Sequence, residues 1–63
     1  MTGDMIRLAQ FLKVADVIES GGEAKLRITD GDVLVNGEVE FRRGRQLRAG
    51  DVVDYDGHRL RVR

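Results

Sequence analysis

The first regular run of apolar positions lies near the N-terminus and has the period of a helix. Its members stand at i, i+3, i+4 and i+7 and are Leu8, Phe11, Leu12 and Ala15. This spacing gives the apolar stripe of a helix that packs one face against a core. We therefore expect a helix that begins near Leu8, and residues 14–18 should lead the chain into the next turn.

A second helix is predicted by the signals at its two ends. Ser20 and Glu23 have the spacing of a capping box, with Ser20 as the N-cap. Gly31 suits the left-handed residue that commonly ends a helix. Between them, Leu26 lies about 160° from Ile28 at 100° per residue, so the two side chains cannot be buried on one face.

From Val33 onward the apolar period changes to two, which is typical of strands. A two-residue Asn36-Gly37 loop would pair Val35 with Glu38 and Val33 with Glu40. Residues that oppose each other lie on the same face of a sheet, so valines and glutamates would then be mixed on one side.

A loop of odd length avoids that conflict. A three-residue loop over residues 36–38 pairs Val35 with Val39 and Val33 with Phe41, which keeps the apolar side chains together. We favour this odd loop, because burial should outweigh turn preference in so small a core.

The second hairpin presents no such conflict. An Asp56-Gly57 turn pairs Tyr55 with His58 and Val53 with Leu60, and it sets Asp54 opposite Arg59 on the outer face. The coarse order is thus helix, helix, then three or four short strands, in one domain of 63 residues. The residues expected in its core are Leu8, Phe11, Leu12, Ala24, Ile28, Val33, Val35, Val39, Leu47, Val53 and Leu60.

Composition narrows the class of protein further. The chain has no cysteine, and no stretch resembles a signal peptide or a membrane-spanning helix, so we expect the cytoplasm. The formal net charge is zero, but residues 1–41 carry four basic against eight acidic side chains, whereas residues 42–63 carry seven against three. A chain with this asymmetry can present a positive face despite its zero sum.

No catalytic or metal-binding constellation is visible in the sequence. His58 is the one histidine and has no partner for a triad or a metal, so we interpret it as a strand residue. Ser20 is explained as an N-cap rather than a nucleophile, and Asp56 belongs to a turn. We therefore expect no enzymatic activity, no metal and no cofactor.

Arg42, Arg43 and Arg45, with Gly44 among them, form what we call the arginine loop, residues 42–45. Guanidinium groups bind phosphate bidentately and stack on bases, and a glycine lets the backbone approach a ligand closely. No acidic residue interrupts the stretch from Arg42 to Arg48, so any local neutralisation must come from elsewhere. Lys25 and the free N–H groups at Gly21 and Gly22 offer a second group of anion donors. Phosphate binding is the simplest interpretation.

Taken in order, these residues resemble the RNA-binding domain named after small-subunit ribosomal protein four, the S-four domain, and in particular its small stand-alone bacterial members. The match covers about residues 6–55. The residues that carry it are Arg7, Leu8, Phe11, Leu12, Lys13, Ser20, Glu23, Ala24, Lys25, Ile28, Gly31, Val33, Val35, Asn36, Gly37, Leu47 and the run Gly50-Asp51-Val52-Val53.

The resemblance implies an α+β fold, with two short N-terminal helices packed on a small, mainly antiparallel sheet of three to five strands. It also implies an RNA-binding face made by the starts of both helices and the loop after the Val-Asn-Gly strand. Carried over by position, the RNA-binding residues are Arg7, Lys13, Lys25, Arg42, Arg43 and Arg45. Many members have a basic residue where this chain has Gln10 and a polar residue where it has Gly21 and Gly22. We therefore expect RNA binding by this chain to depend mainly on the arginine loop.

The function implied is non-catalytic binding of structured RNA by an accessory factor in ribosome assembly or translation. The expected partner is ribosomal RNA in a subunit or its precursor, with transfer RNA as the alternative. We expect a monomer, with neither DNA nor a membrane as partner. One rival is a ubiquitin-like sulfur carrier, disfavoured because the chain lacks a C-terminal Gly-Gly. The other is a protein-interaction module that uses Leu26 and the surface of the second helix.

Overall fold

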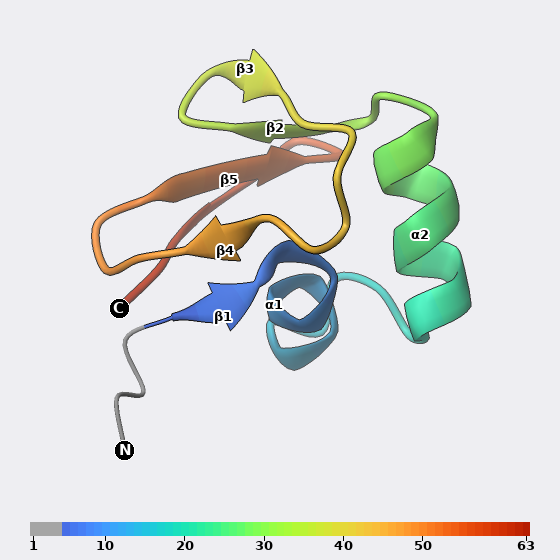
Figure 1. The fold of residues 1–63 in the computed structure, drawn as a ribbon, viewed down its shortest axis with the longest axis horizontal. Coiled ribbons are helices and arrows are strands. Elements are labelled where there is room, and N and C mark those ends of the chain that lie inside the picture. Colours follow the sequence, from blue (N-terminus) through green and yellow to red (C-terminus); the bar gives the residue numbers. More distant parts are fainter. Residues whose placement is uncertain (1–4) are drawn as a thin grey trace.

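The computed structural model describes residues 5–63, in which two helices pack against small antiparallel sheets (Figure 1). The elements follow one another as β1 (Ile6–Arg7), α1 (Leu8–Val14), α2 (Gly21–Thr29), β2 (Val33–Val35), β3 (Glu38–Val39), β4 (Gln46–Leu47), β5 (Val52–Tyr55) and β6 (His58–Arg61). Strands β3, β2, β5 and β6 form one sheet in that order, and β1 and β4 form a two-stranded sheet, all antiparallel. The predicted α+β architecture is confirmed.

Both predicted ends of the second helix are confirmed. The Ser20 hydroxyl accepts a hydrogen bond from the Glu23 N–H at 3.2 Å, which satisfies a backbone donor in the first turn of α2. At the other end Gly31 has a φ of +82°, and the N–H groups of Gly31 and Asp32 donate to the carbonyls of Ile28 and Arg27. This is a Schellman motif. Leu26 is exposed, as its angular position predicted.

The second hairpin also has the predicted register. Tyr55 lies opposite His58, Val53 opposite Leu60, and Asp54 opposite Arg59. The Nε of Arg59 donates to the Asp54 carboxylate at 3.1 Å on the outer face of the sheet.

The first hairpin contradicts the favoured odd loop. The structure pairs Val35 with Glu38, so the loop is the two-residue Asn36-Gly37 turn. Both turn residues have positive φ, at +54° and +86°, which is the conformation that an Asn-Gly turn adopts readily. Turn preference therefore prevails over burial, and Val39 is exposed. Glu40 is the buried residue in its place. Its N–H donates to the Val33 carbonyl at 3.0 Å.

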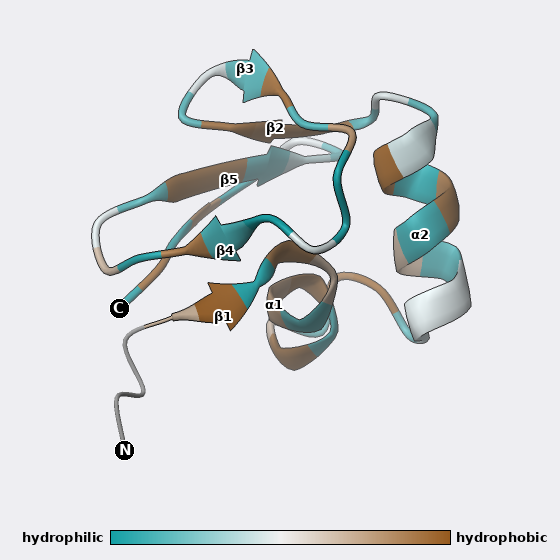
Figure 2. Ribbon diagram, in the orientation of Figure 1, coloured by the Kyte–Doolittle hydropathy of each residue, from teal (hydrophilic) through white to brown (hydrophobic). Residues whose placement is uncertain are grey.

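The core joins both helices to the main sheet, and the β3–β4 connection is hydrophilic over most of its length (Figure 2). Eight of the eleven predicted core residues are buried: Leu8, Leu12, Ala24, Ile28, Val33, Val35, Leu47 and Val53. Phe11 and Leu60 are partly buried, and only Val39 was wrong outright. Ile18 and Val62 are buried core members that the prediction omitted.

Candidate nucleic-acid interface

The arginine loop is docked by its backbone onto the start of α1. The N–H groups of Leu8 and Ala9 donate to the carbonyls of Arg45 and Arg43, at 2.8 and 3.1 Å. These are donors that a helix leaves unsatisfied in its first turn, and the N-cap residue Arg7 supplies no side-chain acceptor for them. The loop backbone therefore caps α1. This contact fixes the loop beside the helix, although the two are more than thirty residues apart in the chain.

The loop itself is tight and anchored at its far end. The Arg45 N–H donates to the Arg42 carbonyl at 3.2 Å, which closes a four-residue turn. Leu47, in β4, is fully buried and lies opposite Ile6 of β1. Leu47, which the sequence predicted as a core residue, thus ties the loop to the core.

Docking of the loop creates a groove of about 480 Å³ that three segments of the chain share. Its lining residues are Arg7, Ala9, Gln10, Lys13, Gly21, Arg43 and Gly44. Three of the six predicted RNA-binding residues therefore meet in one place, namely Arg7, Lys13 and Arg43. Among residues 5–63, no Asp or Glu side chain forms an ion pair with any of these three. The groove is cationic and open to an anion.

The other two loop arginines have an acidic partner in the structure. Glu40 is 8% exposed and lies beneath them. One of its carboxylate oxygens accepts from the Arg42 Nε and the Arg42 N–H, both at 3.1 Å, and the other accepts from the Arg45 guanidinium. The hydrogen bond from the Arg42 side chain, helped by Arg45 and opposed by burial, lowers the pKa of Glu40 to about 2.

Glu40 is the functional residue that the sequence interpretation missed. The positive charge of the arginine loop is partly neutralised by Glu40, two positions before the loop. The odd register that the burial pattern favoured would have turned this side chain outward. The Asn36-Gly37 dipeptide was the signal that could have found it, because a two-residue turn puts Glu40 on the same face as Val33. The three arginines consequently differ in role: Arg45 is held by Glu40 at 33% side-chain exposure, whereas Arg42 keeps 75% exposed.

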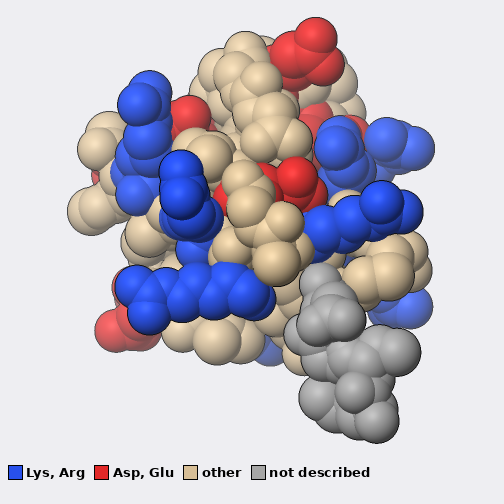
Figure 3. Space-filling model, turned by 90° about the vertical axis from the view of Figure 1, so that its left-hand side faces the viewer, with Lys and Arg blue, Asp and Glu red and all other residues tan. Residues whose placement is uncertain are grey.

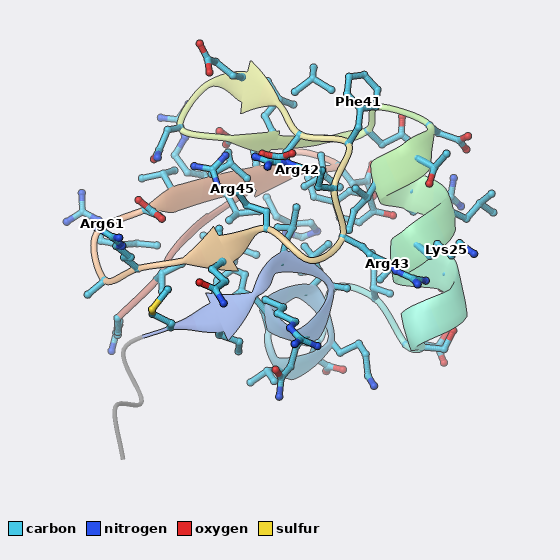
Figure 4. All side chains as sticks on the ribbon, viewed as in Figure 1. Lys25, Phe41, Arg42, Arg43, Arg45 and Arg61 are labelled. Atoms are coloured by element: carbon cyan, nitrogen blue, oxygen red, sulfur yellow. The ribbon has the colours of Figure 1, made fainter. Side chains whose placement is uncertain are left out.

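Lys25 is exposed on α2 and is not among the residues that line the groove. In Figure 4, Arg43 extends from the loop toward α2, on the side where Lys25 lies. Gly21, at the start of α2, lines the groove and has no heavy atom within 4 Å of where a Cβ would stand. The first turn of α2 therefore adds open backbone to the cationic groove.

Other features offer less for an anionic ligand. A second hollow, of about 320 Å³, is lined by Arg27, Asp32, Tyr55 and Asp56, and its two carboxylates disfavour a polyanion. Within residues 5–63 no cluster of His, Asp or Glu could hold a metal ion. None of the helices over the same residues is long and apolar enough to cross a membrane.

Comparison with known proteins identifies the family of the chain. Residues 1–63 match the family model of the S4 domain. The chain is 57% identical over 54 residues to the "Probable ribosome maturation protein RlbA" of Bacillus subtilis, which covers 86% of this chain and 76% of that protein. It is 39% identical over 57 residues to the "Putative RNA-binding protein YbcJ" of Escherichia coli. That match covers 90% of this chain and 81% of that protein. The chain therefore belongs to the S4 domain family.

Proposed function

We propose that this protein binds structured RNA, ribosomal RNA above all, through the groove between α1, α2 and the arginine loop. The observation that carries the proposal is the convergence of Arg7 and Lys13, at the start and end of α1, and Arg43, from the distant arginine loop, on one groove. Membership of the S4 domain family supports it, as do the names of two relatives, one a ribosome maturation protein and the other an RNA-binding protein.

Phosphate contacts supply the affinity. Arginine forks match the geometry of phosphate oxygens, and the backbone at Gly21 and Gly44 lets a phosphodiester chain approach closely. Arg42 and Lys25 extend the cationic surface beyond the groove, since both are exposed. Arg45 contributes through Glu40, by holding the loop in its shape. Such contacts position the protein on a folded RNA without reading its sequence.

The biological role that fits these properties is that of a non-catalytic accessory factor in ribosome assembly or translation. It acts in the cytoplasm as a monomer, on a ribosomal subunit or its precursor. Transfer RNA is the alternative ligand, and neither DNA nor a membrane is needed. No cofactor enters this account, because electrostatic contact with folded RNA is all that it requires.

Co-sedimentation from a cell lysate tests this role. Tagged wild-type protein should travel with ribosomal subunits or their precursors at low salt and less at high salt, and the RNA recovered with it should be ribosomal. The matched control, named the groove variant, carries Arg7→Ala, Lys13→Ala and Arg43→Ala. It should remain folded and stay at the top of the gradient. Wild-type protein that stays at the top at both salt concentrations would contradict the proposal.

A further inference from the structure

Phe41 is an exposed aromatic residue immediately before the arginine loop. Its side chain is 63% exposed, and it is the one aromatic among the large exposed hydrophobic residues within residues 5–63. A phenylalanine exposed to water forgoes much of the stabilisation that burial of such a side chain brings. Its place outside the core follows from the register that turns Glu40 inward.

The ring is held in one place although it faces solvent. The residue before it is anchored by the Glu40 N–H to the Val33 carbonyl at 3.0 Å, and the residue after it by the Arg42 N–H to the Glu40 carboxylate at 3.1 Å. Beneath the ring lies Gly31, the glycine that ends α2. A Cβ on Gly31 would stand 3.4 Å from the Cε1 of Phe41, so the ring rests on that backbone. A fixed ring with an open face loses little entropy when a ligand covers it.

The surroundings of Phe41 decide what that ligand is. Figure 4 shows the side chains of Phe41, Arg42 and Arg43 leaving one short segment in different directions, so a phosphodiester chain that follows this segment would meet the ring and the two guanidinium groups in turn. Proteins hold unpaired RNA bases by this combination, in which aromatic side chains stack on bases while cationic groups take the phosphates.

We propose that Phe41 is a stacking platform for one unpaired base of the bound RNA, next to the phosphates that the arginine loop contacts. This inference rests on the proposed function and adds a ligand feature to it: the RNA has a bulged or looped-out nucleotide beside a paired stem. Because every base has a stackable face, the platform selects an unpaired base without selecting its identity.

Two RNA probes separate stacking from phosphate binding. One is a short hairpin with a single bulged adenosine in its stem, and the other is the same hairpin fully paired. Phe41→Ala should weaken binding of the bulged hairpin roughly 5- to 150-fold, which is the range for loss of one base–aromatic stack. It should leave the paired hairpin unaffected. The control Val14→Ala, at an apolar side chain 70% exposed on α1, should change neither affinity.

The kind of substitution tests whether stacking or mere apolar contact is involved. Phe41→Leu should remain as weak as Phe41→Ala, whereas Phe41→Trp should restore affinity. Because the chain contains no tryptophan, Phe41→Trp adds a single fluorophore, whose emission should be quenched by the bulged hairpin and not by the paired one.

Equal affinity of wild type and Phe41→Ala for the bulged hairpin would overturn the stacking role, as would full rescue by leucine. Equal losses on both hairpins would overturn it too, since the effect would not depend on an unpaired base. These results leave the proposed function standing, provided that the groove variant still loses binding. Wild-type protein that binds neither hairpin would overturn both proposals together.

Discussion

Glu40 shows how a single acidic residue can shape a cationic surface. Its carboxylate is almost fully covered and takes hydrogen bonds from Arg42 and Arg45, so both guanidinium groups have a fixed partner before any RNA arrives. A buried charge is tolerated only when it is paired and hydrogen-bonded. Arg43 has no such partner among residues 5–63 and remains available to a phosphate. One carboxylate thus fixes Arg45 in a structural position, whereas Arg43 and most of the Arg42 side chain remain exposed to a ligand.

Replacement of Glu40 by glutamine should destabilise the fold in a pH-dependent way. The pKa of Glu40 is lowered in the folded protein from 4.5 to about 2, so its stabilisation is complete above about pH 4.5 and is lost as the pH falls through about 2. At pH 7, Glu40→Gln should reduce the free energy of unfolding by about 1–3 kcal/mol. Urea unfolding from pH 7 to pH 2 measures this difference, which should shrink toward pH 2.

The matched control is Glu38→Gln, an exposed carboxylate on the preceding strand. It should change stability by less than about 0.5 kcal/mol at any pH. If Glu40→Gln were as harmless as Glu38→Gln at pH 7, Glu40 would not organise the loop.

Arg43 and Arg45 should separate binding from stability. Arg43→Ala should leave the thermal midpoint nearly unchanged and flatten the dependence of log K on log salt by about 0.7–0.9 for its lost phosphate contact. Arg45→Ala should leave Glu40 with an incomplete set of partners and cost about 1–3 kcal/mol of stability. Calorimetry and RNA titration of both variants provide the comparison. A reversed outcome, with Arg45→Ala alone flattening the slope, would show that the roles are misassigned.

At the scale of elements, the register of the first hairpin decides where Glu40 and Phe41 point. Gly37 has a φ of +86°, whereas Gly44, in the arginine loop, is outside the left-handed region and has open space around its Cβ position. Gly37→Ala should therefore cost about 1–2 kcal/mol of stability, and Gly44→Ala close to none. Thermal unfolding measures both variants. Equal destabilisation would contradict a turn at residues 36 and 37.

Elements with agreeing signals could be predicted from the sequence, and those with conflicting signals could not. Helix α2 had a cap at each end, and the Asp56-Gly57 hairpin had a turn and a burial pattern that agreed. In the first hairpin, turn chemistry and burial point to different registers, and the register favoured by burial is wrong. The turn prevailed because Glu40 could be buried with two arginine partners, a long-range compensation that no local pattern shows.

The residues of the candidate site could be predicted from the sequence, but their arrangement in space could not. The six cationic residues could be named from the sequence through the family resemblance. Their grouping could not, because it depends on the loop carbonyls of Arg43 and Arg45 accepting from the start of α1. Backbone docking of this kind leaves no mark on side-chain patterns. The structure gathers Arg7, Lys13 and Arg43 in the groove and leaves Lys25 outside its lining.

At the scale of the whole molecule, positive charge is not confined to the groove. Lys and Arg side chains also gather on the end of the molecule that faces away from α2 (Figure 3), where Arg61 lies (Figure 4). The net charge of the chain is zero, so attraction of RNA depends on where these side chains are placed. Diffuse attraction by all the basic side chains is therefore the rival explanation of any RNA binding.

The most direct test is a salt series on one structured RNA with two triple variants. The first is the groove variant. The second, the C-terminal variant, removes the same number of charges from the other end and carries Arg59→Ala, Arg61→Ala and Arg63→Ala. If the groove is the binding site, the groove variant flattens the slope of log K against log salt by about 2–3 units, and the C-terminal variant barely changes it. Equal flattening in both variants would contradict a defined site and favour diffuse attraction.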